Sequence, residues 1–165
     1  MCVPGLILPR GSLRLDTRRG SHIDNYYDNS DCPGGVDQES QDFRDRYREC
    51  EHRPTRPTFV YNCHGLTFGS RRTQITDPVT LRKILEEDRY QPVILREVCR
   101  GDIVIYVGDL NEIIHSGFVV AVDRNDQLTS PWLLSKWGGA HEVIHRVGDC
   151  PYAAGARIEY FRIVR

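Results

Sequence analysis

The sequence predicts an α+β fold in which N-terminal helices pack on a C-terminal antiparallel β-sheet. Three observations lead to this fold class. The chain has 165 residues, the length of one ordinary domain with a single core. A clear helix pattern precedes four segments rich in branched and aromatic residues. Short turn-forming sequences separate these segments, so neighbouring strands are expected to run antiparallel.

Residues 1–58 are expected to form an irregular polar arm that wraps a core built from residues 59–165. Most of this arm is charged and poor in aliphatic residues, so it can bury little surface on its own. Within it, the stretch QESQDFRDRYREC carries Phe43 and Tyr47 at a four-residue spacing, which fits one short polar helix. The alternative for this stretch is a surface arm without regular structure.

The segment DPVTLRKILEED has the pattern of a helix with a defined start. Asp77 can cap the helix, and Pro78 suits its first turn. Leu81, Ile84 and Leu85 then fall on one face, which is expected to be buried.

Four later segments are predicted to be strands: GDIVIYVGD, EIIHSGFVVAVD, SPWLLSKWG and RIEYFRIVR. Each is rich in β-branched or aromatic residues. Turn formers such as Gly108–Asp109 and Asn125–Asp126 lie between them. Their order along the chain indicates a sheet made of sequential strands.

Charge and hydropathy exclude two classes of partner. Lysine and arginine total 22 against 23 acidic residues, so the broad positive field of a nucleic-acid-binding protein is missing. No run approaches the roughly 20 apolar residues that cross a bilayer, and the opening MCVPGLILPRG is too short for a secretory signal. We therefore expect a soluble protein of cytoplasmic synthesis, or one exported without a signal peptide. The six cysteines form no C-x-x-C pair, so they indicate neither a zinc ribbon nor a compact disulfide framework.

The stretch HEVIH matches a short zinc-protease motif. On a helix, His141 and His145 would share one face and Glu142 could activate a metal-bound water. However, glycines lie on both sides of this stretch, and Val143–Ile144 favours a strand that would separate Glu142 from the two histidines. The third ligand would have to be Glu159. A zinc metallohydrolase is therefore an alternative, and two edge-strand histidines are the simpler interpretation.

Cys63 lies where the extended run FVYN meets a segment that can form a short helix. A thiol at a helix N-terminus is near unpaired amides and the positive end of the dipole, and both favour thiolate. A cysteine hydrolase also needs an imidazole from a distant part of the chain. His115 fits this need, and Gly117 would keep the neighbouring surface open. The alternative is a buried apolar cysteine and a satisfied core histidine.

Three segments around these residues follow one another in a characteristic order. They are NCHGLT from Asn62 to Thr67, GDIVIY from Gly101 to Tyr106, and HSGFV from His115 to Val119. They resemble the nucleophile segment D-C-S-G-[LF]-[VT], the strand P-G-D-[LIV]-[LIV]-[FY] and the catalytic strand H-[VS]-G-[IF]-[VY] of the NlpC-like and CHAP-type amidases. These amidases belong to the papain-like cysteine hydrolase superfamily.

The resemblance covers about residues 59–123, which is under half of the chain. Three residues depart from the family motifs. Asn62 replaces an aspartate, His64 replaces a small serine, and Arg100 stands where a proline is usual. The nucleophile and base positions are both retained.

The resemblance implies a papain-like fold with Cys63 as nucleophile and His115 as general base and then acid. A third polar group would orient the imidazole. The stretch SKWG resembles the Asn-Ser-Trp-Gly segment of papain-like proteases, which makes Ser135 the candidate, with His141 as its rival. Trp137 would then shield the imidazole contact from water.

The cleft would be completed by residues near the nucleophile. His64 is poorly placed to act as a base for its neighbour and is expected to line the cleft. The backbone amide of Cys63 is a candidate oxyanion donor. The sequence does not identify the second donor, for which Asn62 and Tyr61 are both close enough along the chain.

The implied reaction is hydrolysis of an amide or peptide bond, and it needs no cofactor. The substrate would be a peptide, a peptidoglycan peptide or a protein. The superfamily also includes acyltransferases, deamidases and effector toxins, and a toxin would have an inhibitor or immunity protein as partner. A non-catalytic binding module is the remaining alternative.

Overall fold

The computed structural model describes residues 11–29, 35–125 and 128–164. Within these residues, seven strands form one sheet in the order β1-β6-β5-β4-β3-β7-β2. Every neighbouring pair is antiparallel. The strands are β1 (Glu51–His52), β2 (Tyr90–Val93), β3 (Ile103–Val107), β4 (Ile113–Arg124), β5 (Thr129–Lys136), β6 (Glu142–Arg146) and β7 (Arg157–Ile163). The helices are α1 (Gly35–Arg46), α2 (Cys63–Phe68) and α3 (Pro78–Glu87), with short 3-10 turns η1 (Leu95–Glu97) and η2 (Val147–Asp149).

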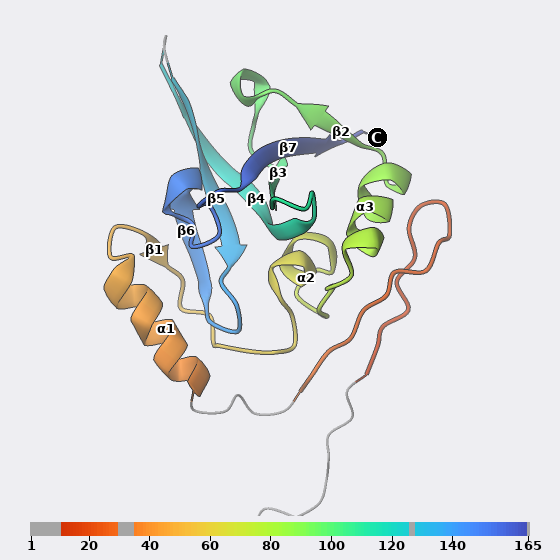
Figure 1. Ribbon diagram of the computed structural model, residues 1–165, viewed down its shortest axis with the longest axis horizontal. Helices are drawn as coiled ribbons and strands as arrows, with labels where there is room; N and C mark the ends of the chain where they lie inside the picture. The colour runs from red at the N-terminus through yellow and green to blue at the C-terminus, as the bar shows by residue number, and fades with distance from the viewer. Residues whose placement is uncertain (1–10, 30–34, 126–127, 165) are drawn as a thin grey trace, which may run out of the picture.

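The dominance of the sheet corrects the predicted fold class. The sequence indicated a papain-like α+β fold with N-terminal helices packed on a C-terminal sheet, and this prediction is wrong. The described part of the chain is mostly antiparallel sheet, and its three α-helices have only 12, 6 and 10 residues (Figure 1). Strand β1 precedes α2, and β2 directly follows α3, so the helices do not form a separate N-terminal block.

The two strands that the sequence analysis missed lie at opposite edges of the sheet. β1 pairs with β6, and β2 pairs with β7. Both are short, and β2 contains Pro92, a residue that sheets tolerate at their edges. Their own sequences carry little strand signal. These segments are extended because they pair with backbone groups that the longer strands would otherwise leave open.

The remaining strand predictions are confirmed. The four segments rich in branched and aromatic residues form β3, β4, β5 and β7. HEVIH lies in extended structure, mostly in β6, as its central Val143–Ile144 favours. The predicted short polar helix is α1, and Phe43 and Tyr47 both pack against Trp137.

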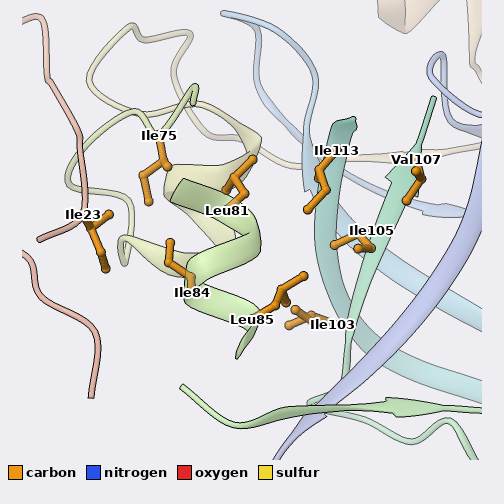
Figure 2. Close-up of a cluster of buried hydrophobic side chains, with 9 residues drawn as sticks. All are labelled: Ile23, Ile75, Leu81, Ile84, Leu85, Ile103, Ile105, Val107 and Ile113. Carbon is orange, nitrogen blue, oxygen red and sulfur yellow. The ribbon is translucent and has the colours of Figure 1, made fainter. Parts of the chain in front are cut away.

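Helix α3 confirms the predicted start and buried face. The Asp77 carboxylate accepts hydrogen bonds from the N–H groups of Val79 and Thr80, and Pro78 lies in the first turn. These contacts satisfy amides that no helical carbonyl can reach. The apolar face packs into a core cluster with β3 and β4 (Figure 2), formed by Ile23, Ile75, Leu81, Ile84, Leu85, Ile103, Ile105, Val107 and Ile113.

The other face of the sheet carries a second apolar cluster. Side chains alternate along β3, so Val104 and Tyr106 point away from the side on which Ile103 and Ile105 meet α3. Tyr160 and the buried Cys150 join this second cluster. Part of this face is therefore covered by the segment between β6 and β7. In the described residues, the helical structure of that segment is the short turn η2.

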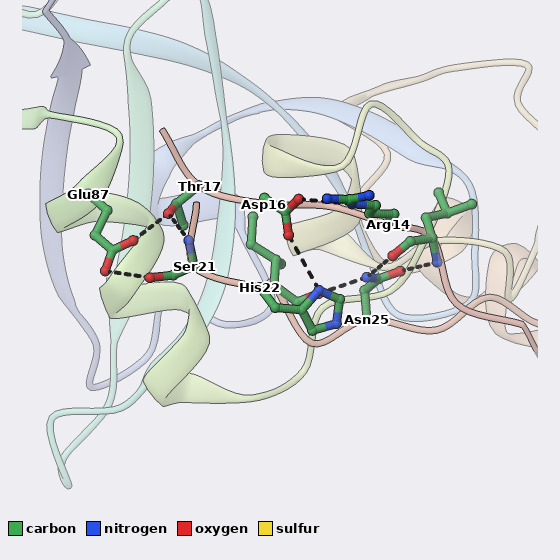
Figure 3. A network of polar contacts seen from close by, with 9 residues as sticks. Arg14, Asp16, Thr17, Ser21, His22, Asn25 and Glu87 are labelled. Carbon is green, nitrogen blue, oxygen red and sulfur yellow. Dashed lines mark hydrogen bonds and ion pairs between the residues drawn. The ribbon is translucent and has the colours of Figure 1, made fainter. Parts of the chain in front are cut away.

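Residues 11–29 run beside α3 as two roughly antiparallel stretches (Figure 1). The hydroxyl groups of Thr17 and Ser21 both donate to the carboxylate of Glu87 (Figure 3). Ile23 inserts into the core beneath them and is 6% exposed. The division of the chain at residue 58 into a polar arm and a catalytic domain stays a prediction.

None of the helices in the described ranges combines the length and the apolar character that a membrane crossing requires.

Candidate functional site

Cys63 is the first residue of α2, and its neighbour Asn62 fixes where the helix starts. The side-chain oxygen of Asn62 accepts the N–H of Gly65 at 2.8 Å and the N–H of Ile75 at 3.2 Å. Its side-chain nitrogen donates to the Ile75 carbonyl at 2.8 Å. Asn62 therefore caps the helix and ties it to the next loop, which occupies its side-chain oxygen and one of its two N–H donors.

Gly65 allows the loop after α2 to approach the helix closely. A Cβ atom added there would lie 1.7 Å from the carbonyl oxygen of Thr73. No side chain fits at that distance, so the glycine of the NCHGLT segment has a steric reason in this chain.

Nearby polar groups act on the Cys63 thiol. The backbones of Ser116, His64 and Cys63 itself and the Lys136 ammonium all lower its pKa. These groups favour thiolate, but burial outweighs them and raises the pKa of Cys63 to about 11. The resting thiol is therefore neutral at pH 7.

The first residues of β4 form an open edge beside the thiol pocket. Strand β4 begins at Ile113, but its pairing with β5 begins only at Gly117. The first residues of β4 therefore have β3 on one side and no strand of the described residues on the other. Ile114, in this part of β4, lines the same pocket as Cys63.

His115 also lies in this first part of β4, and its side chain lies on the face opposite to α2. It pairs directly with Tyr106, whose side chain belongs to the second apolar cluster. Ser116 points to the other face, where its hydroxyl bonds to His64. The chain thus brings Cys63 and His115 to one end of the sheet, with the thiol at the edge and the imidazole on the far face.

The imidazole of His115 is buried and short of partners. It is 1% exposed, and among the described residues its Nε2 has no hydrogen-bond partner. Its ring stacks on Tyr152, with centroids 4.5 Å apart, and meets the edge of Tyr106 at 5.3 Å. Burial, with His64 and His145 nearby, lowers the pKa of His115 well below its ordinary value. The resting imidazole is therefore neutral.

A pocket of about 220 Å³ opens beside the thiol. Its walls are mainly aromatic and glycine residues, and Cys63 and Tyr152 both contribute to it. The lining consists of Thr58, Phe59, Tyr61, Asn62, Cys63, Gln74, Ile114, Gly138, Gly139 and Tyr152. Its volume suits one side chain or a small acyl group. Since Tyr152 also stacks on His115, this residue links the pocket to the imidazole.

Ser135 and Trp137 bond to each other and to His145 instead of to His115. The Ser135 hydroxyl lies 2.7 Å from Nε2 of His145 and accepts the indole N–H of Trp137 at 3.1 Å. The other ring nitrogen of His145 lies 2.7 Å from the Arg146 carbonyl. This closed network gives Ser135 no contact to the candidate base.

His141, the rival orienting residue, is also occupied elsewhere. Its Nε2 lies 2.6 Å from Nδ1 of His52. Its ring therefore belongs to the packing of β1 against β6 and not to the thiol pocket.

His64 faces the sheet and not the cleft. Its Nδ1 lies 2.8 Å from the Ser116 hydroxyl, which donates to Thr67 at 2.9 Å. The Thr67 hydroxyl in turn donates to the Cys63 carbonyl at 2.9 Å. This chain of contacts holds the first turn of α2 on β4, so His64 orients the helix that carries the thiol.

The groups of the zinc motif have protein partners. Glu142 accepts two bonds from Arg71, at 2.6 and 3.0 Å, and one from the Tyr61 hydroxyl at 2.7 Å. Strand geometry points this carboxylate away from His145, as expected. Within the described ranges no group of three or more histidine, cysteine, aspartate or glutamate residues is arranged to hold a metal ion.

Three contributors to the site carried no sequence signal. Ser116 contacts His64 and Thr67 of α2 through its hydroxyl, and Tyr152 comes from the loop between β6 and β7. Lys136 is fully buried, and its ammonium donates to the carbonyls of Gly138 and Ala140 at 3.1 and 2.6 Å. It thereby shapes the loop that walls the pocket. Only contacts across the fold reveal these roles.

A larger hollow of about 840 Å³ lies between β2, β7, the start of β5 and η2. Its lining includes neither Cys63 nor His115. The size of a cavity therefore does not identify the site here, and the chemistry of the smaller pocket does.

Comparisons of the chain with protein-family models, with curated proteins and with solved structures found no match.

Proposed function

We propose that this chain is a cysteine hydrolase in which Cys63 attacks an amide or related carbonyl and His115 transfers the proton. One observation carries the proposal. The thiol lies at the start of a helix and shares a pocket with Tyr152, whose ring stacks on a buried histidine with an unpaired ring nitrogen.

The first step follows from the neutral state of both groups. This step requires the Cys63 sulfur and a His115 ring nitrogen to meet at the end of β4. His115 then accepts the thiol proton, and the electron pair of the S–H bond stays on sulfur as the sulfur attacks the carbonyl carbon. Because the Cys63 thiol and the His115 imidazole are both neutral at rest, the proton must move during the attack. The imidazole therefore acts as a general base, and the enzyme does not hold a resting thiolate–imidazolium ion pair.

Backbone amides favour the charge that develops. The N–H groups of Cys63 and His64 lie at the start of α2, where no helical carbonyl can accept them. The oxygen of a carbonyl under attack would lie near these donors, which supply fixed dipoles at little reorganisation cost. This replaces Asn62, whose side chain caps the helix, as a candidate for the second oxyanion donor.

The reaction then completes by ordinary acyl transfer. The protonated His115 gives its proton to the leaving amine, and a thioester remains on Cys63. Water loses a proton to His115 as it attacks the thioester, and release of the acid restores the thiol. The small aromatic pocket supports a peptide or protein amide as the substrate class, with one side chain or acyl group bound beside the sulfur.

A chromogenic ester tests the proposal without knowledge of the natural substrate. Purified chain incubated with p-nitrophenyl acetate should release nitrophenol and form an acetyl thioester on Cys63, detected by peptide mass spectrometry. Cys63→Ala should abolish this turnover, and His115→Ala should lower it by about 10²-fold or more. Cys99→Ala is the matched control, because Cys99 is an exposed free thiol. Undiminished turnover in Cys63→Ala would overturn the proposal.

A further inference from the structure

Tyr152 makes the most extensive ring contact to the candidate base. Its ring lies 4.5 Å from that of His115, centroid to centroid, with 23° between the planes. Tyr106 meets the same imidazole at 62°, by its edge. The near-parallel partner is therefore Tyr152, which places the face of a π system against the imidazole.

The position of Tyr152 is fixed by its surroundings. The residue follows Cys150, which is 4% exposed in the second apolar cluster. A turn closes with the Ala153 N–H donating to the Cys150 carbonyl at 3.0 Å. The ring itself packs against the second apolar cluster and against the cluster that contains Trp137. The ring is thus held by its backbone turn and by apolar contacts.

The surroundings of His115 make its charged form costly. Nε2 is buried without a partner among the described residues, and the rings of Tyr106 and Tyr152 pack against the imidazole. A cation over an aromatic face within about 6 Å is attracted by the ring quadrupole. Such an attraction acts on the imidazolium and far less on the neutral ring, so it helps only after the proton has moved.

We infer that Tyr152 is a positioning residue for His115: its ring, which lines the thiol pocket, fixes the orientation of the imidazole and stabilises the imidazolium that forms when the Cys63 proton arrives. This inference rests on the proposed hydrolase function. The step is balanced by transfer of one proton from sulfur to a ring nitrogen, with no other reactant. Because the stabilised species exists only during turnover, loss of the ring should lower kcat and leave KM nearly unchanged.

Substitutions at residue 152 separate the aromatic face from the hydroxyl. Tyr152→Phe keeps the face and should retain most of the Cys63-dependent turnover of p-nitrophenyl acetate. Tyr152→Leu keeps apolar bulk without a π face and should lower kcat about tenfold. Tyr152→Met is a second variant of this kind, and circular dichroism identifies which of them folds. Both non-aromatic variants should also shift the His115 ring proton resonances in NMR spectra, because the ring current of Tyr152 is lost.

Each outcome has a defined meaning. Wild-type turnover that survives Cys63→Ala would overturn the hydrolase function and this inference with it. Cys63-dependent turnover that is unchanged in a folded Tyr152→Leu or Tyr152→Met variant would overturn the role of Tyr152 alone. An equal loss in Tyr152→Phe and Tyr152→Leu would also overturn it, because the hydroxyl and not the aromatic face would then matter.

Discussion

The imidazoles of His52 and His141 are joined directly, with Nδ1 of His52 2.6 Å from Nε2 of His141. Nε2 of His52 lies 2.9 Å from the Tyr47 carbonyl, which can only accept, so this nitrogen carries the proton. His141 must then donate to His52, which leaves Nδ1 of His141 unprotonated. That atom is buried and has no hydrogen-bond partner in the described part of the chain.

This pair should make stability fall in mild acid. Burial, aided by the charges of Arg44, His52 and Lys136, lowers the pKa of His141 to about 4. In the unfolded chain a histidine titrates near 6.5. Between these values the unfolded chain binds a proton that the folded chain does not, so stability is present above about pH 6.5 and is lost as the pH falls towards 4.

A substitution isolates the contribution of His141. Urea unfolding at pH 7 and pH 5 should show that His141→Gln reduces the acid-induced loss of stability by about 1–2 kcal/mol relative to wild type. His22→Gln is the control, because that imidazole is 58% exposed. Equal pH dependence in wild type and His141→Gln would contradict the prediction.

The reactivity of Cys63 should rise steadily with pH. Alkylation requires thiolate, and the pKa of Cys63 is raised to about 11 by burial. Its rate of labelling by iodoacetamide should therefore grow about tenfold per pH unit from pH 6 to pH 10. Labelling of Cys63 and Cys99 can be followed separately by peptide mass spectrometry. A plateau for Cys63 below pH 8 would reveal a resting thiolate and a different mechanism.

The ion pair between Glu142 and Arg71 should contribute to stability. Burial opposes ionisation of Glu142, but the hydrogen bonds from Arg71 and Tyr61 outweigh it and lower the pKa of Glu142. Its contribution is therefore present above the unfolded pKa of a glutamate and is lost as the pH falls through the folded value. At pH 7, Glu142→Gln should lower the free energy of unfolding by about 1–3 kcal/mol.

Urea titration measures this loss, and Glu51→Gln is its matched control. Glu51 forms an ion pair with Arg53, but its side chain is 59% exposed. Removal of such a surface pair should cost under about 1 kcal/mol. A similar loss in both variants would mean that the Glu142 network adds nothing beyond a surface pair.

Glu87 should hold the N-terminal segment on α3. Its carboxylate accepts from both Thr17 and Ser21 (Figure 3), and the trypsin sites Arg18 and Arg19 lie between those two residues. Glu87→Ala should free this turn and speed cleavage after the two arginines several-fold, because proteolysis follows local opening. Time courses by mass spectrometry measure the rate. Glu97→Ala, at an exposed site, should leave it unchanged.

Local sequence patterns were enough to predict those helices and strands whose own residues favour that structure. The cap at Asp77, with its apolar face of Leu81 and Ile84, specifies α3. The branched and aromatic runs specify β3, β4, β5 and β7 because such side chains fit a pleated, buried surface. The same reasoning placed Cys63 at the start of a helix and His115 on a strand, since both assignments depend only on nearby residues.

Tertiary structure alone decided the size of the sheet and the partners of its polar residues. β1 and β2 form because the longer strands β6 and β7 leave backbone N–H and C=O groups to be paired. The residues of Glu51–His52 do not themselves indicate this pairing. The bonds of Ser135 to His145 and of His141 to His52 likewise join residues that no local pattern connects. The stacking of Tyr152 on His115 is of the same kind, because contacts between distant segments form only when the whole chain has buried its apolar surface.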